Sequence, residues 1–180
     1  HGIPLTNIIE GGAQERGKRG GTENTPAIAG MAAALREAVD HMVENTEKVT
    51  HLRETLIAGL STIEHARLNG DREQRVPGTV NFCFEGIEGE SLLLLLARKG
   101  IAASSGSACT SGSLDPSHVL LALGLPHEVA HGSLRLSVGE YNTDAEMAYI
   151  VENVRQVVAY LRSISPVWDE LETGARPHLI

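Results

Sequence analysis

Thr79-Val-Asn-Phe-Cys-Phe84 is the stretch of sequence that decides the fold of this chain. Val80, Phe82 and Phe84 share one face and the residues between them share the other, which is typical of a β-strand with one strongly apolar side. Segment 90–99 follows with the broad apolar face of a short helix. A strand followed closely by an apolar helix favours a sheet covered by helices.

The remaining segments fit the same architecture. The alternating stretch Ser133–Val138 predicts another strand, and Thr143-Asp-Ala-Glu146 is a capping box that predicts a final helix. An apolar stripe predicts one long helix from about 26 to 61, with Thr25 as its N-cap and a break near Asn45. We also expect a short strand at 101–103 and a short helix at 116–123. The predicted fold class is therefore α/β, with a short sheet packed by helices.

The charge, apolar runs and cysteine count of the chain exclude several classes of protein. The 180 residues carry a net charge of -8, which argues against a nucleic-acid binder, and no polybasic segment suits an anionic membrane. The longest apolar run, Leu92–Ala97, is far shorter than the roughly 20 residues of a membrane-spanning helix. Two cysteines are too few for a disulfide scaffold, so we expect a reducing, cytoplasmic setting. Because the chain starts at His1 without a methionine, we also expect a piece of a longer protein.

The segment from Glu10 to Asn24 is rich in glycine and carries three cations. Five glycines within eleven consecutive positions exclude a regular element. Arg16, Lys18 and Arg19, together with backbone N–H groups and the Thr22 hydroxyl, suit an anion. The alternative is a plain flexible hinge.

Cys109 lies among small residues, in Ser104-Ser-Gly-Ser-Ala-Cys-Thr-Ser-Gly112. Small side chains cannot pack a core, so this thiol is a candidate nucleophile, and its reactivity depends on exposure and a lowered pKa. The alternative is a surface cysteine in a linker. Cys83, within the predicted strand, is expected to be structural.

Arg135 lies in the middle of the predicted strand 133–138. A guanidinium there must reach water or a partner anion, because burying it without a partner is very costly. The residue is therefore a candidate anion-binding group. The alternative is a solvated arginine on an edge strand.

Four segments in the same order resemble the pyridoxal-phosphate-dependent cysteine desulfurases of the iron–sulfur-assembly and nitrogen-fixation type. The resemblance covers nearly the whole chain. It includes the glycine-rich loop, the cysteine segment, a short helix and the arginine strand, at Gly11–Asn24, Ser104–Ser111, Pro116–Leu120 and Leu134–Gly139.

This resemblance implies the C-terminal part of a fold-type I transferase. Residues 1–45 would be the end of a large cofactor domain, and residues 46–165 would be a small domain with the cysteine segment. The long helix would bridge the two domains, and residues 166–180 would form an irregular tail.

The resemblance also implies roles for particular residues. The thiolate of Cys109 would take sulfur from L-cysteine, leaving L-alanine and a persulfide, and would pass the sulfur to a scaffold or other acceptor protein. The same cysteine could transiently share a nascent iron–sulfur cluster as a metal ligand. Arg135 would pair with the substrate carboxylate. Thr22 would reach a cofactor phosphate held by the partner subunit of a homodimer.

The chain departs from the family pattern in three places. The lysine that binds pyridoxal phosphate in this family lies before the glycine-rich loop in a Ser-His-Lys setting, so it would lie outside this chain, which should be inactive alone. Ala13 replaces a frequent glycine, and Glu140 follows the strand where arginine is common. Two alternatives stay open: a selenocysteine lyase, and a non-enzymatic sulfur-relay or scaffold-binding fragment.

Overall fold

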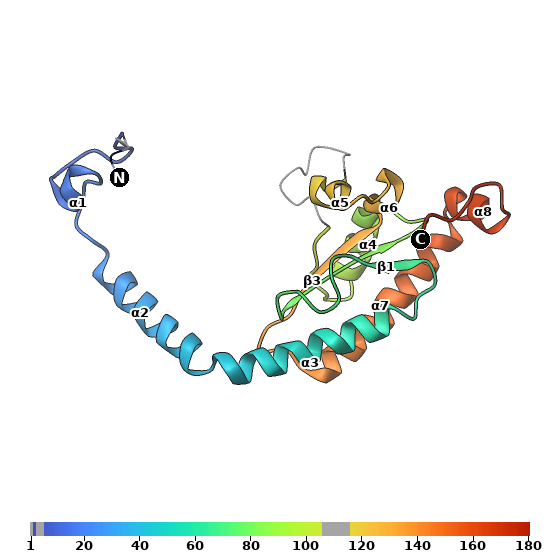
Figure 1. Cartoon of the computed structure of the whole chain (residues 1–180), viewed down its shortest axis with the longest axis horizontal. Coiled ribbons are helices and arrows are strands. Elements are labelled where there is room, and N and C mark those ends of the chain that lie inside the picture. Colours follow the sequence, from blue (N-terminus) through green and yellow to red (C-terminus); the bar gives the residue numbers. More distant parts are fainter. Residues whose placement is uncertain (1, 3–5, 106–115) are drawn as a thin grey trace. The chain divides into compact units, whose positions relative to one another are not determined.

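The computed structural model describes residue 2 and residues 6–105 and 116–180. Its internal contacts divide the chain into two compact units, His1–Val43 and Glu44–Ile180, which can be followed by colour in Figure 1. Cys109 falls outside the described ranges. The assignment of residues 1–45 to a cofactor domain stays a prediction.

The first unit contains a glycine-rich loop and one substantial helix. The loop was expected to hold no regular element, and it contains the short segment α1 (Gln14–Gly17), in which Glu15 and Arg16 have φ values of +51° and +59° and so leave regular α-helical geometry. The helix α2 spans Thr25–Asp40. The N-cap of α2 is Asn24, whose side chain accepts a hydrogen bond from the Ala27 N–H at 3.1 Å. The prediction of Thr25 as the cap was therefore wrong by one residue, because both types can cap but only Asn24 lies outside the helix.

The predicted long helix is two helices. After α2, the backbone of His41 leaves the helical region (φ -102°, ψ 6°), and α3 begins at once and spans Met42–Leu60. The break therefore lies at His41 rather than near Asn45. Asp40 occupies the C-terminal end of α2, where a negative charge opposes the helix dipole and favours termination.

Three antiparallel strands form the sheet of the second unit, in the order β1-β2-β3. They span Ala66–Leu68, Thr79–Phe84 and Ser133–Ser137, so two of the three predicted strands, those at 79–84 and 133–138, are confirmed. β1 was missed because three residues are too few to show alternation. The strand expected at 101–103 is absent, and the chain there makes only an isolated bridge between Ser104 and Arg135.

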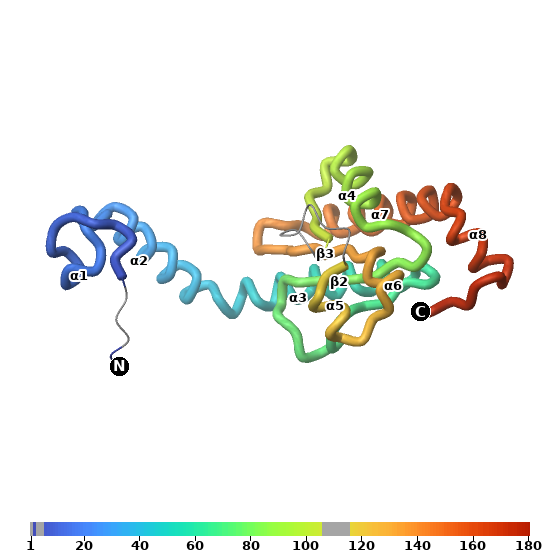
Figure 2. The backbone as a smooth tube through the Cα atoms, turned by 90° about the horizontal axis from the view of Figure 1, so that it is seen from above, coloured from blue at the N-terminus to red at the C-terminus, as the bar shows by residue number. Residues whose placement is uncertain are grey.

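Helices cover both faces of this sheet. On one face, α3, α4 (Gly89–Ala97) and α7 (Asp144–Ser163) enclose the main core around Phe82 and Phe84. On the other face, α5 (His118–Ala122) and α6 (His127–His131) pack a smaller cluster around Cys83. Figure 2 shows β2 and β3 with α4 and α7 on one side and α5 and α6 on the other. The predicted α/β class with a small helix-packed sheet is confirmed.

The predicted irregular tail contains a helix, α8 (Pro166–Glu172). Ser165 caps it by accepting a hydrogen bond from the Trp168 N–H, and Pro166 occupies the first turn, where its missing N–H costs nothing. Trp168 and Leu171 are buried. The serine–proline start signal was present in the sequence, and the two prolines and the glycine nearby obscured it. Within the described ranges, no helix has the length and apolarity needed to cross a membrane.

Candidate functional site

Arg135 occupies the middle of β3, where alternation turns it away from the main core. Its neighbours Leu134 and Leu136 are 1% and 3% exposed, whereas Arg135 itself is exposed. It pairs in register with Asn81 of β2, so the two side chains share one face. The predicted direction of this side chain is confirmed, and its exposed guanidinium is of the kind that binds an anion.

Ser104 fastens the start of the cysteine segment to Arg135. Two backbone hydrogen bonds join the residues, from the Ser104 N–H to the Arg135 carbonyl at 3.0 Å and in the reverse direction at 2.6 Å. The Arg135 guanidinium also donates to the Ser104 hydroxyl at 3.3 Å. This hydroxyl in turn donates to the carbonyl of Ser105 at 2.8 Å. The site therefore ties the arginine directly to the chain that leads into Cys109.

The far end of the cysteine segment is also anchored. Pro116 and Ser117 are buried, and α5 starts directly after them. Leu120 of this helix belongs to the smaller cluster on the sheet. Both ends of the segment that contains Cys109 are thus attached to the packed second unit.

The other cysteine is placed where its chemistry is suppressed. Cys83 on β2 is fully buried, and burial raises the pKa of its thiol even though Asn69 donates a hydrogen bond to the sulfur at 3.1 Å. A thiol held protonated and out of solvent is a poor nucleophile. The prediction that Cys83 is structural agrees with this placement.

The glycine-rich loop of the first unit closes on itself. The Gly20 N–H donates to the Ile9 carbonyl at 3.0 Å, and a Cβ on Gly20 would lie 2.7 Å from backbone atoms of Gly11. Only glycine permits this approach, and Gly21 that follows has a φ of +95°. The loop thus has a defined crossing just before Thr22.

Thr22 and the three loop cations are exposed beside this crossing. A hydroxyl, guanidinium groups and an ammonium are a donor set that fits a phosphate. The residues of this chain therefore fit the phosphate of the expected cofactor. Thr22 belongs to the first unit and Arg135 to the second, so the predicted site residues are distributed over separate units.

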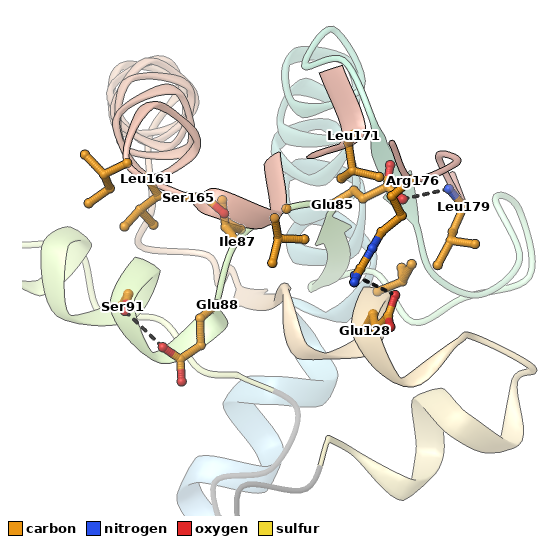
Figure 3. A pocket seen from close by; sticks show the side chains of 14 residues that line it. Glu85, Ile87, Glu88, Ser91, Glu128, Leu161, Ser165, Leu171, Arg176 and Leu179 are labelled. Carbon is orange, nitrogen blue, oxygen red and sulfur yellow. Dashed lines mark hydrogen bonds and ion pairs between the residues drawn. The ribbon is translucent and has the colours of Figure 1, made fainter. Parts of the chain in front are cut away.

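A cavity that sequence reasoning did not anticipate lies beside the C-terminal segment. Its volume is about 440 Å³, and Figure 3 shows its lining. Leu161, Leu171 and Leu179 give it apolar walls. Arg176 crosses its rim and forms an ion pair with Glu128 at 3.4 Å. Its lining comes from several elements far apart in sequence, so no local pattern marks it.

Comparison with known protein families identifies the family of this chain. The family model for aminotransferase class V matches residues 10–150. The chain belongs to this family.

Within this family, the chain is similar to cysteine desulfurases. The chain is 50% identical over 173 residues to a cysteine desulfurase IscS of Clostridium botulinum, covering 94% of this chain and 44% of that protein. It is 48% identical over 168 residues to the cysteine desulfurase NifS of Azotobacter vinelandii, covering 93% and 42%. A solved NifS-like protein matches with a TM-score of 0.75 and 34% identity, covering 89% of this chain and 40% of the other. The chain therefore spans less than half the length of these relatives.

Proposed function

We propose that this chain is the sulfur-carrying part of a cysteine desulfurase. The observation that carries the proposal is the bridge between Ser104 and Arg135, because it attaches the cysteine segment to the arginine expected to hold the substrate. The similarity to cysteine desulfurases over more than nine-tenths of the chain supports the same activity.

The proposed reaction moves the sulfur atom of the substrate L-cysteine onto the thiol of Cys109. The Cys109 thiolate attacks the sulfur of L-cysteine, so an S–S bond forms as the substrate C–S bond breaks. The electron pair of that C–S bond passes to the substrate carbon, which gains a proton and becomes the methyl group of L-alanine. Cys109 then carries a persulfide, and no external oxidant or reductant is required.

Arg135 would bind and orient the substrate. A guanidinium forms a planar fork that matches both oxygens of a carboxylate. The hydrogen bond to the Ser104 hydroxyl and the flanking buried leucines fix the direction from which that fork emerges. Holding the carboxylate at this point restricts where the substrate sulfur can lie relative to β3.

The sequence spacing supports delivery of Cys109 to this position. Cys109 follows Ser104 by five positions, so covalent geometry limits the span between their Cα atoms to about 18 Å. That reach exceeds the length of a cysteine substrate, and it also lets the same thiol meet an acceptor outside the protein.

Pyridoxal 5′-phosphate is the proposed cofactor, and when bound it supplies the electron sink that makes the substrate C–S bond breakable. Thr22 would donate its hydroxyl to the phosphate, and the closed glycine loop would place backbone close to that group. The lysine that holds the cofactor would lie outside this chain.

The proposed partners follow from the proposed cysteine desulfurase function. We propose a homodimer in which Thr22 serves the cofactor of the other subunit, and an iron–sulfur scaffold or other protein that accepts sulfur. Cys109 would transiently share a nascent cluster as one ligand. The cytoplasm is the proposed location, since the described cysteine, Cys83, is a free thiol and sulfur transfer requires free thiols.

The two cysteines provide a matched test in the complete protein. With pyridoxal phosphate and L-cysteine, we expect stoichiometric alanine and one added sulfur, located by alkylation and mass spectrometry of tryptic peptides. Trypsin separates the cysteines, because Cys109 lies in peptide 100–135 and Cys83 in peptide 76–98. We expect Cys109→Ser to abolish both products and Cys83→Ala to retain them.

Other results would reject the proposal in definite ways. Undiminished alanine production by Cys109→Ser would remove Cys109 as the nucleophile. Sulfur on Cys109 only when an external persulfide donor is supplied, with no alanine from cysteine, would make the protein a relay. A strong preference for selenocysteine over cysteine would make it a selenocysteine lyase.

A further inference from the structure

Two histidines and a buried glutamate meet at the end of the sheet that the C-terminal segment covers. The side chains of His65, Glu85 and His178 bring one ligand atom each to within 4.8 Å of one another. We propose that these three residues form a binding site for one divalent transition-metal ion of the zinc type. None of these three residues is among those proposed for sulfur transfer.

The sheet itself places two of the three ligands. Ala66 of β1 pairs with Phe84 of β2, so the next residues outward, His65 and Glu85, lie opposite each other. The Glu85 N–H donates to the His65 carbonyl at 3.0 Å and extends the ladder by one step. His65 has a φ of +50°, in the left-handed region that histidine, asparagine and aspartate adopt more often than other residues with a side chain. The sheet therefore fixes this pair without help from the tail.

The C-terminal segment brings the third ligand. The His178 Nδ1 lies 2.8 Å from the Glu85 Oε2, and the Leu179 N–H donates to the Glu85 Oε1 at 2.6 Å. The His65 Nδ1 lies 3.6 Å from the same Oε2. Ligand atoms around a tetrahedral zinc ion are about 3.4 Å apart, given bonds of roughly 2.0–2.2 Å. The observed separations bracket that value.

The surroundings suit a coordinated ion. The Glu85 side chain is only 6% exposed, and those of His65 and His178 are 31% and 32% exposed. The edge of the Trp168 ring system packs against both imidazoles, with centroids 5.6 and 5.7 Å away. A buried carboxylate beside two imidazoles and an aromatic wall gives the ligand types that zinc prefers in a site of low dielectric. The exposed edges of the histidines leave a path for the ion to enter.

Loading the site would change the present arrangement in a defined way. The two imidazole rings are stacked, with centroids 3.6 Å apart and planes 13° from parallel. Their Nδ1 atoms contact the Glu85 carboxylate and the Ile180 carbonyl, which accept protons in hydrogen bonds. For an ion to bind at Nδ1, the single proton of each neutral ring must lie on Nε2, and the rings must tilt apart so that both lone pairs converge. His178 can provide this tilt, because residues 175–180 form neither helix nor strand.

One nearby charge opposes binding. Arg162 donates to the backbone carbonyls of Glu64, His65 and Glu85 at 2.8 to 3.1 Å and stacks on Trp168. Because the donors of Arg162 go to carbonyls, Oε2 of Glu85 stays available to the histidines, while Oε1 accepts from the Leu179 N–H. The positive charge of Arg162 nevertheless lowers the affinity for a cation, and we expect moderate rather than extreme affinity.

The site would also fix one wall of the cavity. Leu179 lines the cavity, and its N–H is the group that Glu85 holds, as Figure 3 shows. An ion bound by His178 and Glu85 would attach the residue before Leu179 to the same carboxylate that already holds the Leu179 N–H. Metal loading would therefore set the position of the C-terminal segment.

Zinc chloride titration of the complete metal-free protein tests the site, without an affinity tag and with Cys109→Ser to remove a competing thiol. Calorimetry should give one zinc ion per chain, with the heat saturating at that ratio. Cobalt(II) should give visible d–d absorption of a four- or five-coordinate site. We expect His178→Ala and Glu85→Gln each to weaken zinc binding at least tenfold.

His131→Ala is the matched control, since His127 and His131 form the other close histidine pair, with ring centroids 4.8 Å apart. It should bind zinc like the parent protein. His65→Asn, which tolerates the left-handed backbone, should weaken binding in parallel with His178→Ala. The proposal is overturned if zinc does not bind, if His178→Ala binds it unchanged, or if only His131→Ala loses it.

Discussion

The thiol of Cys83 lies between β2 and the helices α5 and α6, in contact with a cluster that includes Leu120 and Val129. In the folded chain we expect iodoacetamide to modify it at least tenfold more slowly than in guanidinium, because the reagent needs an exposed thiolate. Burial raises its pKa above the ordinary 9.0, so the thiol form is favoured and its contribution to stability is complete below that pH. The contribution is lost as the pH rises through the raised pKa. Rapid labelling of Cys83 itself in the folded protein at neutral pH, located in peptide 76–98, would contradict this assignment.

Arg135 gives a second prediction about a single side chain. In the complete enzyme, Arg135→Ala should raise KM for L-cysteine, because it removes a charged hydrogen-bonded pair worth roughly 1.5–3 kcal/mol. Arg135→Lys should recover only part of the loss, since an ammonium lacks the planar fork. Cysteamine, which lacks the carboxylate, provides the control as a competing ligand. Its affinity should be the same in all three proteins, and an equal loss for cysteamine would place Arg135 outside the carboxylate site.

At this scale, alternation along a strand predicted the direction of Arg135 correctly, because a period of two assigns every side chain to a face. It could not find the cluster of His65, Glu85 and His178. Those residues lie 20 and 93 positions apart along the chain, and only strand pairing and the path of the tail bring them together. The placement of Cys109 and its role in the site stay predictions.

At the scale of elements, Gly59 allows α3 and α7 to pack closely. A Cβ on Gly59 would lie 2.6 and 2.7 Å from the two methyl groups of Val151. Gly59→Ala should therefore destabilise the fold by about 1–3 kcal/mol through overpacking, although alanine is the better helix former. Val151→Ala removes both methyl groups, and the double variant should recover much of the loss. Denaturant unfolding of the four proteins measures the coupling, and strictly additive changes would show that this contact is not close.

Elements with a clear local signal were predicted, whatever their length. The capping box at Thr143 and Glu146 is present in both directions and starts α7 as expected, and the short helix expected at 116–123 is α5. β1 and α6 were missed, since neither the three residues of β1 nor the five of α6 show a regular pattern. The tail helix α8 was missed although its cap was visible, because its stability comes from burying Trp168 and Leu171 against distant segments. Tertiary contacts, and not local preference, decide such short elements.

At the scale of the whole molecule, the two units differ in how they are stabilised. Residues 44–180 contain the sheet and both hydrophobic clusters. In the described part of residues 1–43, no apolar side chain is buried, and the stripe on α2 is open to solvent. Ile28, Met31, Leu35 and Val39 on this stripe are 51 to 68% exposed. A helix of 16 residues without packing is only marginally stable in water.

This difference predicts where the 180-residue chain opens first. In this chain by itself, amide hydrogens of α2 should exchange rapidly, while those of α7 should be protected by the packed core. Trypsin should cut at Arg36 before it cuts at Arg155 in the middle of α7. In a protein of the relatives' full length, of which this chain spans 44%, other segments can cover the stripe, so α2 should become protected and Arg36 should resist cleavage. Exchange measured by mass spectrometry on both proteins checks this, with α7 as the internal reference. Equal protection of α2 and α7 in the 180-residue chain would mean that the exposed stripe is already stable without any covering segment.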